Sequence, residues 1–157
     1  MHPWAHLMIS VGVASTIGLM ATPVAAQEHC PDPRIQNEAI VSVQTGLFAA
    51  LENEDKVSWA RLTDRDFVAF ESGHRYDRTN FFELVRSAHA GGRHFEWSVT
   101  TPRLEMSCTV ATLAYVNQGA VTQGSSRSAV SWLETATFRY AAGRWRAVFV
   151  ESMREAD

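Results

Sequence analysis

The sequence predicts an α+β domain in which three N-terminal helices pack on a curved, mostly antiparallel sheet. Residues 34–90 mostly show apolar side chains at the three- and four-residue spacing of helices. Residues 94–153 are instead rich in Val, Thr, Trp, Phe and Tyr and are divided by glycine-containing turns. Helices followed by a run of hairpin-linked strands are typical of this class. The chain shows no internal repeat or linker, so we expect one domain over 34–153.

The N-terminus is interpreted as a cleavable export signal over residues 1–26. Residues 7–21 carry no charge and are too few to span a bilayer, which needs about 20 apolar residues. Val24 and Ala26 are the small residues that a signal peptidase reads before the cleavage point. Histidines stand in the first six residues where Lys or Arg is usual, so an uncleaved anchor is the alternative. We therefore expect a periplasmic or secreted protein with no stable membrane association after cleavage.

The composition indicates a globular protein that does not bind nucleic acid. The chain is 46% hydrophobic and 20% charged, which is ordinary for a folded domain. Its formal net charge is −3 and its basic residues are scattered. Nucleic-acid binding needs concentrated positive charge, so that class of partner is not expected.

The two cysteines, Cys30 and Cys108, are expected to form a disulfide if the chain is exported. An oxidising compartment permits such a bridge, and closing this loop would contribute roughly 3–4 kcal/mol to stability. Two unpaired thiols are the alternative. Two cysteines so far apart do not indicate a metal site.

A helix is expected after an extended lead-in over residues 27–33. This segment contains Pro31 and Pro33, and proline disfavours helix in the residue before it. The apolar residues that follow recur at helical spacing, and they are Ile40, Val43, Leu47, Phe48 and Leu51. A second, short helix is expected over 57–62.

A short strand and a third helix come next. Residues 67–70 form a short apolar run that predicts a strand. The third helix is expected to begin near Asn80, because Glu83 then lies in the capping-box position. It is expected to end at Ala90, before a pair of glycines.

Four further strands are expected to complete the sheet. Their ranges are 94–106, 109–117, 128–140 and 144–153. Residues 154–157 are left as a C-terminal tail.

The last two of these strands carry the candidate catalytic residues. With a two-residue turn at Ala142 and Gly143, Glu134 lies opposite Glu151 on the more apolar face, which also carries Phe149. A register slipped by one would place arginines among the aromatic side chains, which is costly. Opposed glutamates have Cβ atoms about 5 Å apart, and carboxylates that close cannot both ionise cheaply. One would titrate high, as a general acid or base must.

Three further residues, His74, Tyr115 and Trp97, are candidates to complete a ligand site together with Phe149. Tyrosine or histidine would polarise a carbonyl, and tryptophan would wall the pocket. Two alternatives stay open for the glutamates: ligand binding without chemistry, or structural ion pairs with arginine. The arginines within reach of the second alternative are Arg75, Arg78 and Arg103.

The sequence contains no other motif for catalysis or cofactor binding. There is no Gly-x-Ser-x-Gly elbow and no glycine-rich phosphate loop before a helix. His89 and His94 have no third ligand at a fitting spacing, so neither is expected to hold a metal. We expect no cofactor.

Four segments resemble motifs of the nuclear transport factor 2-like superfamily, which includes ketosteroid isomerases and SnoaL-like cyclases. Residues 49–55 resemble its "ALxxGD" helix end, and 62–67 look like its "LTDDF" strand entry. Residues 110–115 are similar to its "AxVxY" strand, and 143–148 to its final "GxWRIV" strand. The likeness is greatest to the small SnoaL-like branch. It implies a cone-shaped fold with a pocket at its open end and, frequently, a dimer formed through the sheet.

The resemblance does not imply one activity, because this fold hosts many. The base and oxyanion residues of ketosteroid isomerases cannot be placed on matching positions of this chain. The leading hypothesis is an exported protein that binds a small, mostly apolar molecule in the cone. The alternatives are a cofactor-independent isomerase, cyclase or dehydratase that uses Glu134 or Glu151, and a dimerising structural module without a ligand.

Overall fold

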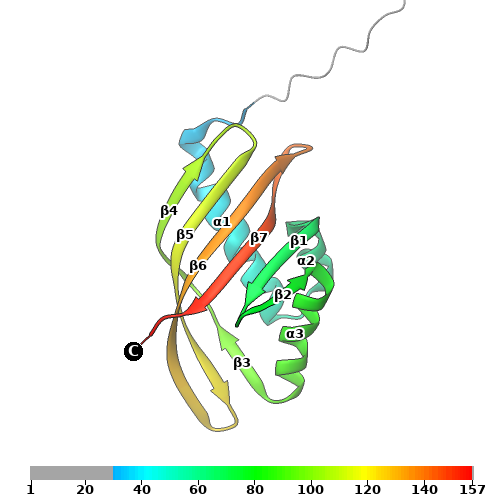
Figure 1. Ribbon diagram of the computed structural model, residues 1–157, viewed down its shortest axis with the longest axis vertical. Coiled ribbons are helices and arrows are strands. Elements are labelled where there is room, and N and C mark those ends of the chain that lie inside the picture. Colours follow the sequence, from blue (N-terminus) through cyan, green and yellow to red (C-terminus); the bar gives the residue numbers. More distant parts are fainter. Residues whose placement is uncertain (1–29, 157) are drawn as a thin grey trace, which may run out of the picture.

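The computed structural model describes residues 30–156, so the predicted export signal lies outside the described part. Three helices precede most of the sheet: α1 (Pro33–Glu52), α2 (Lys56–Leu62) and α3 (Arg78–Ala90). In Figure 1, α1 runs behind the sheet while α2 and α3 lie beside its short first strands. Among residues 30–156 no helix has the length and apolar character needed to cross a membrane.

Seven strands form one curled, mixed sheet, in keeping with the predicted α+β class. Its strands are β1 (Thr63–Glu71), β2 (His74–Asp77), β3 (Arg93–Glu96), β4 (Val99–Met106), β5 (Val110–Gln123), β6 (Ser126–Ala141) and β7 (Arg144–Arg154). The order is β2-β1-β7-β6-β5-β3, and β4 also pairs with β5. Every pairing is antiparallel except that of β1 with β7, which is parallel.

The expected strand over 94–106 is in fact two strands, β3 and β4, which separate at Trp97 and Ser98. The cause lies opposite, at Gly119 on β5. A Cβ atom at this glycine would come within 1.8 Å of the carbonyl oxygen of Glu96. The two backbones therefore approach more closely than any side chain would permit, and the ladder is interrupted there.

The third helix begins earlier than the capping-box pattern indicates. Asp77 is its N-cap, and its Oδ1 accepts a hydrogen bond of 2.8 Å from the backbone N–H of Asn80. Glu83 does not reach back to a cap and instead forms an ion pair of 2.6 Å with Arg86. Asp77 caps the helix in place of Asn80, because its carboxylate also interacts favourably with the positive end of the helix dipole.

The core lies between α1 and the face of the sheet that α1 covers. Its members are buried apolar residues from all three helices and from the four strands β1, β5, β6 and β7, including Ile40, Leu47, Trp59, Phe67, Phe82, Leu113, Phe138 and Trp145. Helical residues at three- and four-residue spacing meet strand residues at two-residue spacing, as the pattern of the sequence requires.

A disulfide joins Cys30 to Cys108, with Cα atoms 4.7 Å apart. Cys108 lies in the turn between β4 and β5, so the bond fixes the segment before α1 to the sheet. Figure 1 shows this start of α1 beside the β4–β5 turn.

Candidate functional site

The register of the final hairpin changes halfway along its length. Near the turn, Phe138 faces Ala147, as the two-residue turn predicts. A bulge then shifts the pairing by one residue on the β7 side. Beyond it, Glu134 faces Ser152, whereas Glu151 faces Thr135. The predicted pair of opposed glutamates is therefore wrong.

The bulge places the two glutamates on opposite faces of the sheet. Glu134 lies on the α1 side with only 8% of its surface exposed. Glu151 is exposed on the outer face. Phe149 also lies on the outer face, where its ring centroid is 5.3 Å from that of Phe70. The structure thus separates Phe149 and Glu151 from Glu134.

Three neutral side chains donate hydrogen bonds to the buried carboxyl group of Glu134. The hydroxyl of Tyr115, directly across the ladder on β5, donates to Oε2. Asn117 Nδ2 donates to Oε1 at 2.9 Å, and Ser152 Oγ donates to the same oxygen at 3.1 Å. The donors come from β5 and β7, the two strands that flank Glu134 on β6, so the curled sheet itself builds the cluster. We call Tyr115, Asn117, Glu134 and Ser152 the Glu134 cluster.

Asn117 is held in place by the break between β3 and β4. Its Oδ1 accepts a hydrogen bond of 3.0 Å from the backbone N–H of Ser98, the residue at that break. This contact fixes which end of the amide points at Glu134. Since Asn117 is fully buried, its orientation follows from the backbone and not from solvent.

The pKa of Glu134 is raised above its ordinary value of 4.5, chiefly because burial disfavours the charged form. Hydrogen bonds from Asn117, Tyr115 and Ser152 oppose this rise, and the charge of Glu71 adds to it. The pKa of Tyr115 is raised well above 10.0, first by burial and then by the charge of Glu134. The tyrosine therefore stays a hydrogen-bond donor.

A row of polar residues crosses the inner face from the edge of the sheet to Glu134. On β1, Glu71 faces Ser152 on one side and His74 of β2 on the other. Exposure falls along this row, because His74 is exposed, Glu71 and Ser152 are half-buried, and Glu134 is buried. The second carboxylate on the face of Glu134 is thus Glu71 and not Glu151.

Trp97 lies one ring away from the Glu134 cluster. Its ring stacks on Phe48 of α1 at 5.5 Å, and Phe48 in turn meets Tyr115 edge-on at 6.3 Å. On its other side Trp97 stacks on Phe95 at 5.1 Å. Of the predicted ligand residues, Tyr115 contacts Glu134 directly, and His74 lies at the outer end of the same polar row. Trp97 packs on Phe48, which in turn packs on Tyr115.

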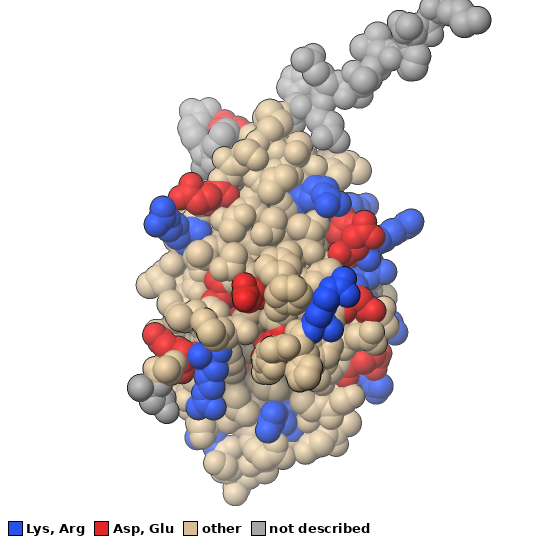
Figure 2. Space-filling model, viewed as in Figure 1, with Lys and Arg blue, Asp and Glu red and all other residues tan. Residues whose placement is uncertain are grey.

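No arginine whose side chain the structure describes forms an ion pair with Glu134. Arg103 pairs with Glu105 at 3.1 Å on the surface, and none of the other ion pairs between described residues includes Glu134. The face in Figure 2, which is the outer side of the sheet, shows acidic and basic side chains scattered among uncharged ones. It carries no broad basic surface.

Sequence reasoning missed three residues of this site. Asn117 is two residues beyond Tyr115 on one strand, so alternation alone would have placed it on the same face. Ser152 required knowledge of the bulge. Glu71 required knowledge that β1 pairs with the last strand, a contact between residues about eighty positions apart that no local pattern signals.

Glu134 lines neither of two hollows on the described surface. One, of about 430 Å³, lies beside the β6–β7 turn. The other, of about 340 Å³, lies at the opposite end of the hairpin, where Arg154 and Gly119 contribute to it. Across residues 30–156 no group of three or more His, Cys, Asp or Glu is placed to hold a metal ion.

Comparison with solved structures shows that the chain has the nuclear transport factor 2-like fold, which confirms that resemblance. An NTF2-like protein from Cytophaga hutchinsonii matches with a TM-score of 0.65 at 12% identity, covering 76% of this chain and 98% of that one. A candidate dehydratase of the NTF2-like family from Streptomyces avermitilis matches at 0.69 and 13% identity, covering 80% and 100%. The CaMKII hub homology domain of Chlamydomonas reinhardtii matches at 0.64 and 15% identity, covering 77% and 99%.

No family model and no curated protein sequence matches the chain. Membership of the SnoaL-like branch stays a prediction. At these identities the likeness establishes the fold, and the function has to be argued from the site.

Proposed function

We propose that this chain is an exported domain that binds a small organic molecule against the inner face of its sheet, at the Glu134 cluster. The observation that carries the proposal is the buried carboxyl group of Glu134, which three neutral donors surround and no cation of the described residues neutralises. Burying such a group costs stability. A site that retains it is typical of ligand recognition or acid–base chemistry.

The surroundings favour a ligand with a mainly apolar body and one carbonyl or hydroxyl group. Phe48, Trp97 and Tyr115 supply aromatic surface next to the carboxyl group. The exposed part of Glu134, with half-buried Ser152 and Glu71 beside it, supplies the polar contact. Few convergent polar groups on an apolar wall are the usual composition of a small-molecule site.

Native mass spectrometry of protein purified from its own periplasm tests this proposal. We expect a bound small molecule on the wild-type protein, lost in Glu134→Leu and reduced in Tyr115→Phe. Glu151→Gln is the matched control, because it removes a carboxyl group from the opposite face of the same hairpin. Equal occupancy in Glu134→Leu and the wild type would contradict the assignment of the site.

Proton transfer next to a carbonyl is a second candidate function, favoured by the pairing of two carboxyl groups in different environments. Buried Glu134 tends to keep its proton, so it can donate a hydrogen bond to a carbonyl oxygen while the hydroxyl of Tyr115 holds the carboxyl group in place. Half-buried Glu71 lies on the same face, across Ser152, and can accept a proton from the adjacent carbon. In this proposal Glu71 is the second carboxyl group of the acid–base pair, a role that the sequence analysis assigned to Glu151.

Deuterium exchange tests this chemistry without knowledge of the substrate. The probe is 2-tetralone in D₂O, whose α-protons exchange slowly and are followed by NMR. We expect the wild-type protein to accelerate the exchange and Glu71→Gln to abolish that acceleration, while Glu151→Gln retains it. An acceleration that survives Glu71→Gln would remove Glu71 as the proton acceptor.

Export itself is tested by the N-terminus of the secreted chain. Cleavage after Ala26 predicts an intact mass that corresponds to residues 27–157, whereas an uncleaved anchor predicts the full 157 residues. Val24→Asp should block cleavage, because the peptidase requires a small residue there.

A second copy of this chain is the partner that the outer face of the sheet favours. Phe70, Leu133 and Met153 lie on that face with 42%, 42% and 62% of their surface exposed. Exposed apolar side chains gathered on one face mark interaction surfaces. Hub and association domains among the structural neighbours support an assembly through this fold.

A further inference from the structure

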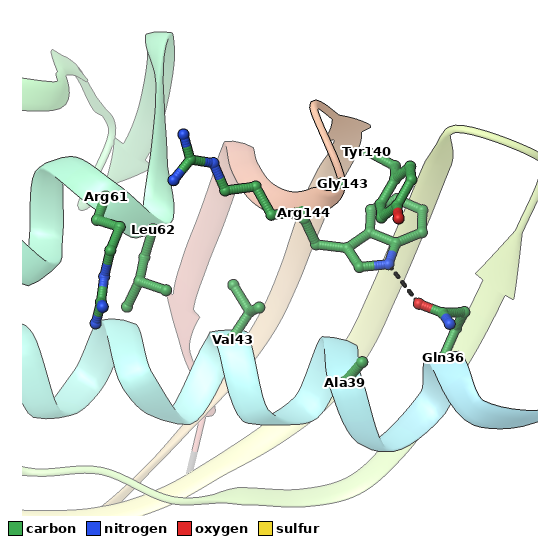
Figure 3. A pocket seen from close by; sticks show the side chains of 9 residues that line it. Gln36, Ala39, Val43, Arg61, Leu62, Tyr140, Gly143 and Arg144 are labelled. Carbon is green, nitrogen blue, oxygen red and sulfur yellow. Dashed lines mark hydrogen bonds between the residues drawn. The ribbon is translucent and has the colours of Figure 1, made fainter. Parts of the chain in front are cut away.

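The hollow beside the β6–β7 turn has an apolar floor and one aromatic end. Ala39 and Val43 project into it from α1, and Tyr140 and Trp145 wall it on the hairpin side (Figure 3). The indole N–H of Trp145 donates a hydrogen bond of 2.6 Å to Oε1 of Gln36 on α1. The ring of Tyr140 lies 5.2 Å from that of Trp145. These contacts fix the aromatic wall in place.

The other end of the hollow is basic. Arg61 at the end of α2 and Arg144 at the start of β7 both line it, and both are exposed. Figure 3 shows the two guanidinium groups at the end away from Tyr140. Neither arginine forms an ion pair with a carboxylate of the described residues. Arg61 lies close enough to Asp55 for its charge to help lower the pKa of that carboxyl group, but the two form no ion pair. Two guanidinium groups beside an apolar floor are complementary to an anion that carries an apolar body.

We propose that this hollow binds a small organic carboxylate that carries a ring. Its carboxylate group lies at the basic end of the hollow, within the positive field of Arg61 and Arg144, and its ring covers Val43 and extends toward Trp145. Guanidinium groups bind carboxylates through paired, charge-assisted hydrogen bonds. Burying the ring removes apolar surface of both partners from water. The hollow, of about 430 Å³, is large enough for a two-ring molecule.

This site is separate from the Glu134 cluster. Tyr140 and Glu134 are six positions apart on β6, which places them about 20 Å apart along the strand. The two sites also prefer opposite charge, since one contains carboxyl groups and the other guanidinium groups. The proposal therefore does not depend on the function assigned to Glu134.

An NMR titration of the mature chain with 1-naphthylacetate tests the proposal. The reporter is the indole N–H signal of Trp145, assigned by its absence in Trp145→Phe. We expect a saturable shift of this signal with 1-naphthylacetate. The neutral analogue 1-naphthylacetamide, which has the same ring and nearly the same shape, should bind at least tenfold more weakly. Equal affinity for the amide, or no saturable shift with the acid, would overturn the proposal.

Arginine variants with a matched control localise the binding. Arg61→Gln combined with Arg144→Gln should weaken 1-naphthylacetate at least tenfold, since both side chains are exposed and their loss leaves the core intact. Arg146→Gln removes one charge from the same strand but does not line the hollow, so its affinity should stay within twofold of the wild type. An equal loss in Arg146→Gln would mean that general surface charge carries the binding, and the proposal would fall.

Discussion

Tyr115 on β5 donates a hydrogen bond to the buried carboxyl group of Glu134, its direct partner across the ladder on β6. Both residues lie on the face that α1 covers. The tyrosine keeps its proton because burial raises its pKa, and the glutamate favours its protonated form for the same reason. The pair is therefore held in a state that proteins seldom bury without a use.

The first prediction concerns the pH dependence of stability. Because the pKa of Glu134 is raised in the folded state, the unfolded chain releases this proton at lower pH than the native protein does. The stability that this group contributes is fully present below pH 4.5, the ordinary pKa of glutamate. It is lost as the pH rises through the pKa of the folded state, at up to about 1.4 kcal/mol per pH unit. Glu134→Gln does not titrate, so its stability relative to wild type should increase over that range. Urea unfolding at several pH values measures the difference.

Glu151→Gln is the control for this experiment. It leaves Glu134 in place and so should keep the slope of the wild type. A Glu134→Gln curve that runs parallel to the wild-type curve at all pH values would contradict the raised pKa.

The second prediction concerns the disulfide. Cys30 and Cys108 are separated by 78 positions, and a loop of that length corresponds to about 4 kcal/mol of stabilisation in the chain-entropy account. The free energy of unfolding of the variant with both cysteines changed to Ser should be lower by that amount. The variant should therefore unfold at a lower urea concentration. The reduced wild-type protein should behave like the variant. Identical midpoints for oxidised and reduced protein would show that the bond contributes nothing.

The third prediction concerns Gly119. Adding a methyl group in Gly119→Ala would bring it against the carbonyl oxygen of Glu96, so the β3 and β5 backbones must move apart. Overpacking of this kind costs about 1–3 kcal/mol. Gly91→Ala is the matched control, because its nearest atoms lie at 3.4 Å and its φ is −82°. The same unfolding assay checks both, and an equal loss in the two variants would contradict the account.

Because the β3–β4 break also orients Asn117, Gly119→Ala should disturb the Glu134 cluster. Binding of the proposed ligand should therefore weaken in Gly119→Ala and stay unchanged in Gly91→Ala.

The fourth prediction concerns self-association through the outer face. Leu133→Glu places a charge directly opposite Met153 among the exposed apolar residues there and should convert a dimer to a monomer in sedimentation velocity. Val57→Glu is the control: Val57 is 81% exposed, but it lies on α2, away from that face. A wild-type protein that sediments as a monomer at high concentration would refute the dimer.

Local patterns in the sequence predicted most of the elements. The spacing of Ile40 to Leu51 predicted α1, and the turn at Ala142 and Gly143 gave the correct register for the first few pairs of the hairpin. These features depend on neighbours along the chain, so periodicity and turn chemistry are sufficient to find them.

The site depended on features of longer range. A single bulged residue in β7 exchanges the faces of Glu151 and Ser152, and nothing in the residue types there announces it. The pairing of β1 with β7 brings Glu71 to Ser152 from the other end of the domain. Gly119, which the sequence analysis placed between two strands, lies inside β5, where a glycine marks an irregularity of the strand.

The parallel pairing of β1 with β7 also makes one edge of the sheet depend on the end of the chain. The strand that carries Glu71 has no neighbour on its inner side without the last eleven-residue strand. The polar row from His74 to Tyr115 runs through β7, so it is continuous only when that strand is in place. A chain that is truncated before its last strand would lack Ser152, and the proposed ligand site would be incomplete.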